Sequence, residues 1–215
     1  DFRRVDPTEN VPTDELVPML VFQYGNDVRI IHRLDRELRR PLARPSELPP
    51  IRHAYIPANG LDARAVGRLW DSIALTAGEE DVLTALRIIA PGTERLNLVG
   101  ENGRDHQRYP VVKTQNTEEP VPLRSLGEGM SRMFGIALAL VNAQDGLLLV
   151  DEIESGLHYS VQPELWQLIF LVAERLNVQV VATSHSWDCI EAFQNAAAED
   201  PEEGVLIRLS RKGED

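Results

Sequence analysis

The first half of the chain alternates apolar runs with turn-forming residues, and elements are expected at 16–34, 51–57, 61–75, 79–89 and 94–114. In the first range two apolar runs flank Gly25-Asn26-Asp27, a turn signal that predicts a β-hairpin. A brief strand is expected in the second. In the next two ranges apolar residues recur every three or four positions, which predicts two helices. The last range is typical of two strands joined by a polar turn.

From residue 125 the pattern alternates between helix-like and strand-like segments. Helices are expected at about 131–142, at 160–176 and after Ser186, and strands at 147–150, 178–182 and 206–209. The continuous apolar runs of the first two strands are typical of buried parallel strands. This order predicts an α/β fold, with a parallel sheet flanked by helices and a smaller lobe of hairpins and helices before it.

Composition narrows the class of protein without deciding its function. The chain has 215 residues, of which 43% are hydrophobic, and its net charge of −12 does not favour binding to nucleic acid or an anionic membrane. No apolar run is long enough to span a membrane, and the first residues show no signal region. The start also lacks a methionine, so we expect a trimmed or partial chain. A cytoplasmic location is the expectation.

A few individual side chains carry weaker signals. The single cysteine, Cys189, excludes an internal disulfide and is expected to be buried and inert, and the three tryptophans are expected to pack rather than bind a ligand. Residues 35–50 are expected to form a short helix that runs into a loop. The surrounding arginines are either a solvated helix face or a patch that faces DNA; they are Arg29, Arg33, Arg36, Arg39, Arg40 and Arg44.

Two carboxylates follow the strand expected at 147–150, and a histidine follows the next strand. In phosphoryl-transfer enzymes an acidic residue at this place holds Mg²⁺, and a second one orients or deprotonates the attacking water, which are the roles open to Asp151 and Glu152. Because parallel strands end at one edge of a sheet, His185 can reach the same point. Taken singly, the acidic pair also fits a strand-end turn, and His185 also fits a hydrogen-bonded loop histidine.

The loop Gly127-Glu128-Gly129 precedes the helix expected at 131–142. Backbone N–H groups at a helix start suit an anion such as a γ-phosphate, although two glycines also fit a plain turn. The specific signal is the order of the clusters. One helix and one strand fit between Gly129 and Asp151, and again between Asp151 and His185.

Three stretches together resemble a known family. They are SLGEGMSRMFGIALALVNA at 125–143, GLLLVDEIESGLH at 146–158 and VVATSHSWD at 180–188. The chain resembles the C-terminal part of the ABC-type ATPase heads of the SMC, RecF and OLD-like group. Within that group it is most similar to bacterial AAA-family ATPases of the ATP/GTP-binding type. The stretches correspond to the signature loop, the Walker B strand with its D-loop, and the switch-histidine loop.

The resemblance implies a P-loop NTPase-like fold and a role for each matching residue. Asp151 would bind Mg²⁺, Glu152 would be the catalytic base and His185 would contact the γ-phosphate. The D-loop would lie at a head-to-head dimer interface, and the signature loop would contact nucleotide held by the partner head. The residues of these two loops are Glu154, Ser155, Gly156 and His158, and Ser125, Gly127, Glu128 and Gly129.

The chain departs from the family pattern in two places. Gly127 stands where such signatures usually carry serine, and Ser125 lies two residues earlier. More important, the chain contains no G-x-x-x-x-G-K-[ST] loop, the motif that holds the β- and γ-phosphates. We therefore expect residues 1–124 to be the middle region of the head and 125–215 its C-terminal subdomain. A separate or missing N-terminal half would supply the P-loop.

Three functions compete at this point. The first is an ATPase with ATP and Mg²⁺ as cofactors, active as a homodimer once joined to its P-loop half, with DNA or an effector protein as further candidate partners. The second is a non-hydrolysing dimerisation or regulatory module. The third is a metal-dependent hydrolase that uses Asp151, Glu152, Glu154 and His185, which strand alternation disfavours because neighbouring side chains point to opposite faces.

Overall fold

A computed structural model describes residues 19–24, 28–33, 52–100, 108–127, 129–198 and 204–209. The chain divides into two compact units, residues 1–50 and 51–215. In the first unit β1 (Met19–Tyr24) and β2 (Val28–Arg33) pair antiparallel, with Met19 opposite Arg33 and Tyr24 opposite Val28. This pairing confirms the expected hairpin. The turn residues 25–27 and the helix expected at 35–50 lie outside the described residues.

The second unit contains a parallel sheet with the strand order β3-β7-β8. Its strands are β3 (His53–Ile56), β7 (Leu147–Val150) and β8 (Gln179–Ala182). The strands are in register, with Tyr55 opposite Leu149 and Leu149 opposite Val181. The sequence predicts each strand, but the partner of β3 is a strand about ninety residues away, a pairing that local pattern does not reveal. The α/β class with a parallel sheet and flanking helices is confirmed.

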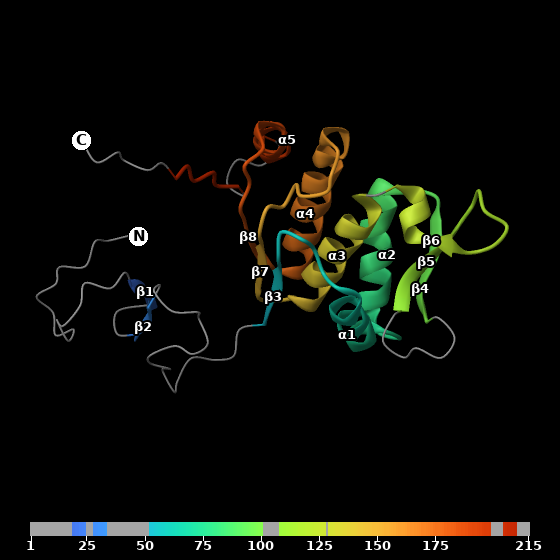
Figure 1. Ribbon diagram of the computed structural model, residues 1–215, viewed down its shortest axis with the longest axis horizontal. Helices are drawn as coiled ribbons and strands as arrows, with labels where there is room; N and C mark the ends of the chain where they lie inside the picture. The colour runs from blue at the N-terminus through green and yellow to red at the C-terminus, as the bar shows by residue number, and fades with distance from the viewer. Residues whose placement is uncertain are drawn as a thin grey trace, which may run out of the picture. The chain divides into compact units, whose positions relative to one another are not determined.

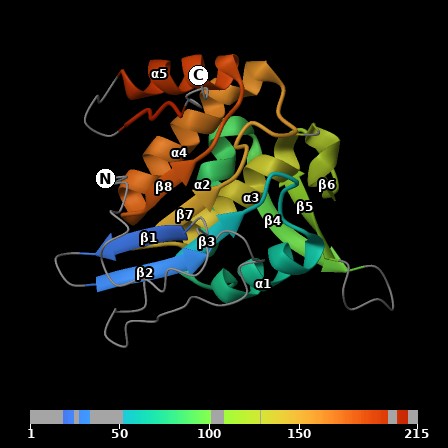
Figure 2. The same cartoon turned by 60° about the vertical axis from the view of Figure 1, so that its left-hand side comes forward.

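Helix α3 (Gly129–Asn142) is the centre of the core. Nearly every residue from Met130 to Val141 is buried, as expected for a helix surrounded by other elements. In Figure 1, α3 and α4 (Gln162–Leu176) lie between the parallel sheet and α2 (Ala77–Ile89). Helix α5 (Trp187–Ala197) follows β8 and packs against α4 (Figure 2).

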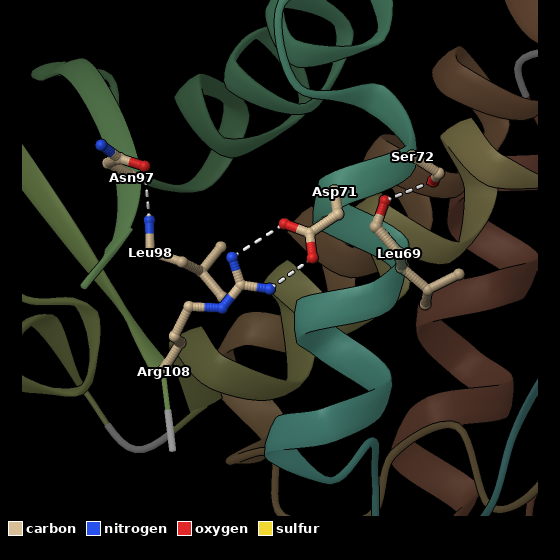
Figure 3. Close-up of polar contacts among 6 residues, drawn as sticks. All are labelled: Leu69, Asp71, Ser72, Asn97, Leu98 and Arg108. Carbon is tan, nitrogen blue, oxygen red and sulfur yellow. Dashed lines mark hydrogen bonds and ion pairs between the residues drawn. The ribbon is translucent and has the colours of Figure 1, made fainter. Parts of the chain in front are cut away.

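A second, antiparallel sheet has the order β4-β5-β6. It comprises β4 (Thr93–Gly100), β5 (Arg108–Thr114) and the short β6 (Val121–Pro122). Arg108 at the start of β5 forms a bidentate ion pair with Asp71 of α1 (Ala63–Ile73), with Nη1 and Nη2 2.8 and 2.5 Å from the carboxylate oxygens (Figure 3). The hydrogen bond to Arg108 lowers the pKa of Asp71. This pair fixes the second sheet to the helical layer.

Local signals explain most element ends. Asp62 and Thr76 accept backbone N–H bonds at the starts of α1 and α2, and Ser186 does so at α5, as its sequence position predicts. Gly146 directly precedes β7, and a Cβ there would lie 2.0 Å from the carbonyl oxygen of Arg52, so only glycine fits at this position. Two short 3₁₀ helices, Leu123–Leu126 and Tyr159–Val161, lead into α3 and α4.

Three sequence expectations are wrong. Residues 204–209 form no strand and are largely exposed, because no neighbouring strand among the described residues pairs with them. Strand β8 is not buried, since it lies at the edge of its sheet and Val181 is 50% exposed. Trp70 and Trp166 pack in the core as expected, but Trp187 is 76% exposed at the first turn of α5.

Candidate functional site

The carboxyl ends of β7 and β8 bring Asp151 and Thr183 together. The Thr183 hydroxyl donates to Oδ1 of Asp151 at 2.7 Å and accepts the backbone N–H of Glu152 at 2.9 Å. The backbone extends this connection, since Asp151 N–H donates to the carbonyl of Ile56 at 2.9 Å. One hydroxyl thus orients both acidic residues. Sequence reasoning missed Thr183, although its place directly after a strand was a usable signal.

Glu152 has an unusual backbone conformation. Its φ of +44° lies in the left-handed region, which non-glycine residues seldom adopt. The guanidinium of Arg132 stabilises this bend, because Nη2 donates hydrogen bonds to the carbonyls of Asp151 and Glu152, each at 3.0 Å. Backbone held in such a region often marks a functional site. The exposed Glu152 side chain therefore leaves the sheet at a turn fixed on both sides.

Arg132 is the second residue that sequence reasoning missed. It lies on α3, is only 9% exposed, and its Nη1 donates to the carbonyl of Pro57 after β3 at 2.8 Å. Burial lowers the pKa of its guanidinium, while the nearby carboxylates of Glu154, Asp151 and Glu152 oppose that shift. A buried arginine inside a nearly apolar helix was the signal that could have found it. Its charge joins the glycine-loop helix to the ends of β3 and β7.

Glu154 connects the loop after β7 with the loop after β8. Its Oε1 accepts the backbone N–H groups of His185 at 2.8 Å and of Ser186 at 3.1 Å. Ser186 in turn caps α5 by accepting the N–H of Cys189 at 3.3 Å. His185 itself is exposed. The backbone of His185 therefore lies beside the loop that follows the acidic pair, and the reach of its side chain to Asp151 and Glu152 stays a prediction.

Cys189 is fully buried behind this loop, as expected. Burial raises the pKa of its thiol, the hydrogen bonds from Ser184 and Trp166 being the smaller, opposing effect. A thiol with a raised pKa carries little thiolate and is a poor nucleophile. Covalent catalysis by Cys189 is therefore disfavoured.

The glycine loop borders the D-loop candidate within the same chain. Ser125 lies in the 3₁₀ turn, Gly127 has a φ of +135°, and Glu128 lies outside the described residues. Gly129 begins α3, and a Cβ there would lie 2.9 Å from Cδ2 of Leu157. Gly129 thus packs against the loop that follows Glu154.

Of the remaining D-loop candidates, Gly156 and His158 are exposed and Ser155 is half-buried. Gly156 has a φ of +76°, and a Cβ there would meet nothing within 4 Å. The His158 ring bonds through Nδ1 to the hydroxyl of Ser160 at 2.9 Å and lies 4.3 Å from the ring of Tyr159. Ser155 bonds through its N–H to the carbonyl of Glu152 at 2.8 Å. These residues form a turn beside the acidic pair, and their side chains do not converge on it.

The side chains at this edge fit Mg²⁺ better than a metal ion that is held entirely by protein ligands. Among the described residues no three His, Cys, Asp or Glu side chains gather as a metal group. Mg²⁺ is usually held by one or two carboxylates together with substrate phosphates. Asp151, oriented by the Thr183 hydroxyl, matches that type of site, with the outer hydrogen bond that such ligands usually have.

Comparison with known proteins places this arrangement in a family. A family profile described as "AAA domain, putative AbiEii toxin, Type IV TA system" matches residues 93–188, from β4 to the start of α5. An uncharacterized protein of Methanocaldococcus jannaschii is 34% identical over 89 residues, which are 41% of this chain and 78% of that protein. The chain belongs to this AAA domain family. The matched range contains all the candidate site residues.

Solved structures of SMC ATPases show a general likeness. A chain from work on ATP-driven dimerization and DNA stimulated activation of SMC ATPases has a TM-score of 0.42 and 12% identity, covering 59% of this chain and 76% of that one. The SMC head domain from Thermotoga maritima has a TM-score of 0.43 and 15% identity, covering 64% of this chain and 46% of that one.

No helix among the described residues is long and apolar enough to cross a membrane.

Proposed function

We propose that this AAA domain is the C-terminal part of an ATPase that hydrolyses ATP with Mg²⁺ at the interface of two heads. The observation that carries the proposal is the joint placement of Asp151, Glu152 and His185. Thr183 orients the first two, and Glu154 holds the backbone of the third beside them. Phosphoryl transfer needs a positioned metal ligand, a group that orients water and a contact to the transferred phosphate, and these residues could supply all three.

The roles follow from chemistry and position. Asp151 would bind the ion, which when present neutralises charge on the β- and γ-phosphates. Glu152, exposed and fixed at its backbone, would orient the attacking water and take its proton. His185, at the end of the neighbouring strand, would donate a hydrogen bond to the γ-phosphate. Water exclusion at this open edge would come from the partner head.

An open face of the parallel sheet supports a missing N-terminal half. Tyr55, Leu149 and Val181 lie in register across β3, β7 and β8, and are 55%, 37% and 50% exposed. Alternate positions such as Ile56, Leu148 and Val150 are buried on the opposite face. Sheets of parallel strands usually have both faces covered. We infer that the half that carries the P-loop covers this apolar row, and that it holds the nucleotide at the carboxyl edge.

Dimerisation would complete the site from the other side. Ser125, Gly127, Glu128 and Gly129 would approach the partner's nucleotide, with the α3 N-terminus directed at phosphate. The exposed turn with Ser155, Gly156 and His158 would lie near the two-fold axis. On this proposal the motifs divide functionally between residues 124 and 125, although residues 51–124 and 125–215 belong to one compact unit. DNA or an effector protein would act on the assembled dimer.

The test is Glu152→Gln in the intact protein. The amide preserves size but cannot take the proton of water, so ATP binding should persist while turnover falls by about 100-fold or more. Binding is measured by calorimetry and turnover by phosphate release, with Glu174→Gln on the exposed side of α4 as the control. Unchanged turnover would remove Glu152 from this role and favour a non-hydrolysing dimerisation or regulatory module.

A metal-dependent hydrolase has less support. That reading needs Glu154 as a ligand beside Asp151, Glu152 and His185, but Oε1 of Glu154 already accepts two backbone N–H groups. The absence of a three-residue metal group among the described residues agrees with this. Tight binding of a divalent cation without nucleotide would reverse the preference.

A further inference from the structure

Glu154 belongs to the D-loop candidates, yet its carboxylate is directed into its own chain. Oε1 accepts two consecutive N–H groups, those of His185 and Ser186, at 2.8 and 3.1 Å. Oε2 is buried and has no hydrogen-bond partner among the described residues. A carboxylate in this position is not presented to a partner head. It acts as a clamp between two loops.

The backbone around the clamp strengthens it. Ile153 N–H donates to the carbonyl of Thr183 at 3.0 Å, directly before Glu154 reaches the same loop. Ser186 is the N-cap of α5, so the carboxylate also lies at the positive end of that helix. Charged acceptors make hydrogen bonds about twice as strong as neutral ones. The loop with His185 is therefore tied to the acidic loop at three residues, Thr183, His185 and Ser186.

The clamp lies in the field of a buried cation. The Glu154 carboxylate is the largest of the charge interactions that oppose the lowering of the Arg132 pKa by burial. Arg132 Nη2 holds the carbonyls of Asp151 and Glu152, while Glu154 holds the N–H groups of His185 and Ser186. The Arg132 cation thus binds backbone carbonyls of one loop, and the Glu154 anion binds backbone N–H groups of the neighbouring loop. Arg132 therefore connects α3 with the acidic loop, and Glu154 connects that loop with the loop that contains His185.

We propose that Glu154 is a positioning residue that fixes the His185 backbone relative to Glu152, and that it makes no contact with nucleotide or the partner head. The proposal rests on the proposed ATPase function for its catalytic consequence, but the clamp itself does not. The His185 side chain is exposed, and its backbone N–H is held by Oε1 of Glu154. Loss of the clamp therefore leaves the histidine present and misplaced.

The first experiment measures the clamp without activity. Amide hydrogen exchange of residues 183–188 is followed in the intact protein for Glu154→Ala, Glu154→Gln and the control Glu174→Gln. Without the acceptor, exchange at His185 and Ser186 should accelerate by about tenfold or more. Glu154→Gln keeps a carbonyl oxygen and should fall between wild type and alanine. Unchanged exchange in Glu154→Ala, at an unchanged melting temperature, would overturn the proposal.

The second experiment separates positioning from direct contact. ATP turnover is measured for Glu154→Ala, His185→Ala and the double variant. If Glu154 acts through His185, kcat falls in each single variant while KM for ATP changes little, and His185→Ala costs much less in the Glu154→Ala background. Fully multiplicative losses would mean that Glu154 acts independently and would refute the positioning role.

The two experiments also keep the proposals apart. Faster exchange in Glu154→Ala combined with normal turnover in Glu152→Gln would leave the clamp standing and remove the ATPase function. Normal exchange in Glu154→Ala combined with lost turnover in Glu152→Gln would remove the clamp and leave the ATPase function standing. Glu154→Gln guards against a folding artefact, because it preserves the size of the side chain and one acceptor oxygen.

Discussion

Thr183 shows how one hydroxyl organises the acidic pair. The hydroxyl donates a hydrogen bond to Asp151 and accepts one from the N–H of Glu152. Because the hydroxyl has a single hydrogen, donating it to Asp151 leaves a lone pair to accept the Glu152 N–H. Valine has the same shape but can do neither. Serine can do both, with less restriction of its side-chain rotamer. The three residue types therefore separate hydrogen bonding from packing at this position.

We expect Thr183→Val to reduce ATP turnover of the intact protein by about tenfold, since a hydrogen bond to a charged group is lost. Thr183→Ser should retain most of the activity. Because Thr183 is exposed, neither change should alter the melting temperature by more than a degree or two. Steady-state kinetics over a range of Mg²⁺ concentrations measure the effect. Equal losses in valine and serine would show that packing, not the hydroxyl, matters.

The start of α3 is the element that decides whether the signature assignment is right. Gly129 faces Cδ2 of Leu157, the mobile end of a flexible side chain, so a small substituent displaces that leucine at little cost. An acidic residue at the first turn of a helix is favoured by the helix dipole. Substitutions at Gly129 should therefore leave the fold intact, and their functional effects can be attributed to the surface.

We expect Gly129→Asp to prevent ATP-dependent dimerisation of the intact protein while ATP binding persists. A side chain at this position points toward Leu157 of its own chain, so the new charge would repel the partner's γ-phosphate through space from the N-terminus of α3. Light scattering with ATP in a Glu152→Gln background measures it, with Gly129→Ala as the uncharged control. If the Asp variant dimerises as well as its parent, residues 125–129 are only a turn before a helix.

At the scale of the whole chain, the candidate site lacks a phosphate-binding loop. The acidic pair, His185 and the glycine loop are present, but no G-x-x-x-x-G-K-[ST] sequence occurs in the 215 residues. The backbone amides and the lysine of that loop make most of the contacts that bind the β- and γ-phosphates. The open apolar row on the parallel sheet is the surface on which the missing half would pack.

We expect the 215-residue chain by itself to show no ATPase activity and no ATP binding at micromolar concentrations. Joining it to a P-loop half should restore both. Calorimetric titration with ATP and Mg²⁺ measures the binding, and Asp151→Asn serves as the control in the joined protein. A micromolar affinity in the isolated chain would reveal a phosphate site that the motifs do not account for.

Local patterning foretold much of this architecture and its site. Helical spacing predicted α1 and α2, apolar runs predicted β7, and Ser186 was correctly expected to cap α5. The rule that parallel strands end at one edge predicted that the loops after β7 and β8 meet, and Thr183 and Glu154 connect these loops. These successes concern short segments or a general rule of topology. The strand expected at 206–209 is wrong, because a strand forms only beside a pairing strand, which the local sequence does not reveal.

By itself the sequence determined most of the elements, the motifs and the residue types that the proposed phosphoryl transfer would use. Tertiary structure decided which backbone groups those residues hold. Thr183, Arg132 and Glu154 each bind atoms of segments distant in sequence, and β3 pairs with a strand far along the chain. The physical reason is that periodicity records which face of a segment is apolar, whereas a hydrogen bond depends on which chain segments meet, and only the packed core fixes that meeting.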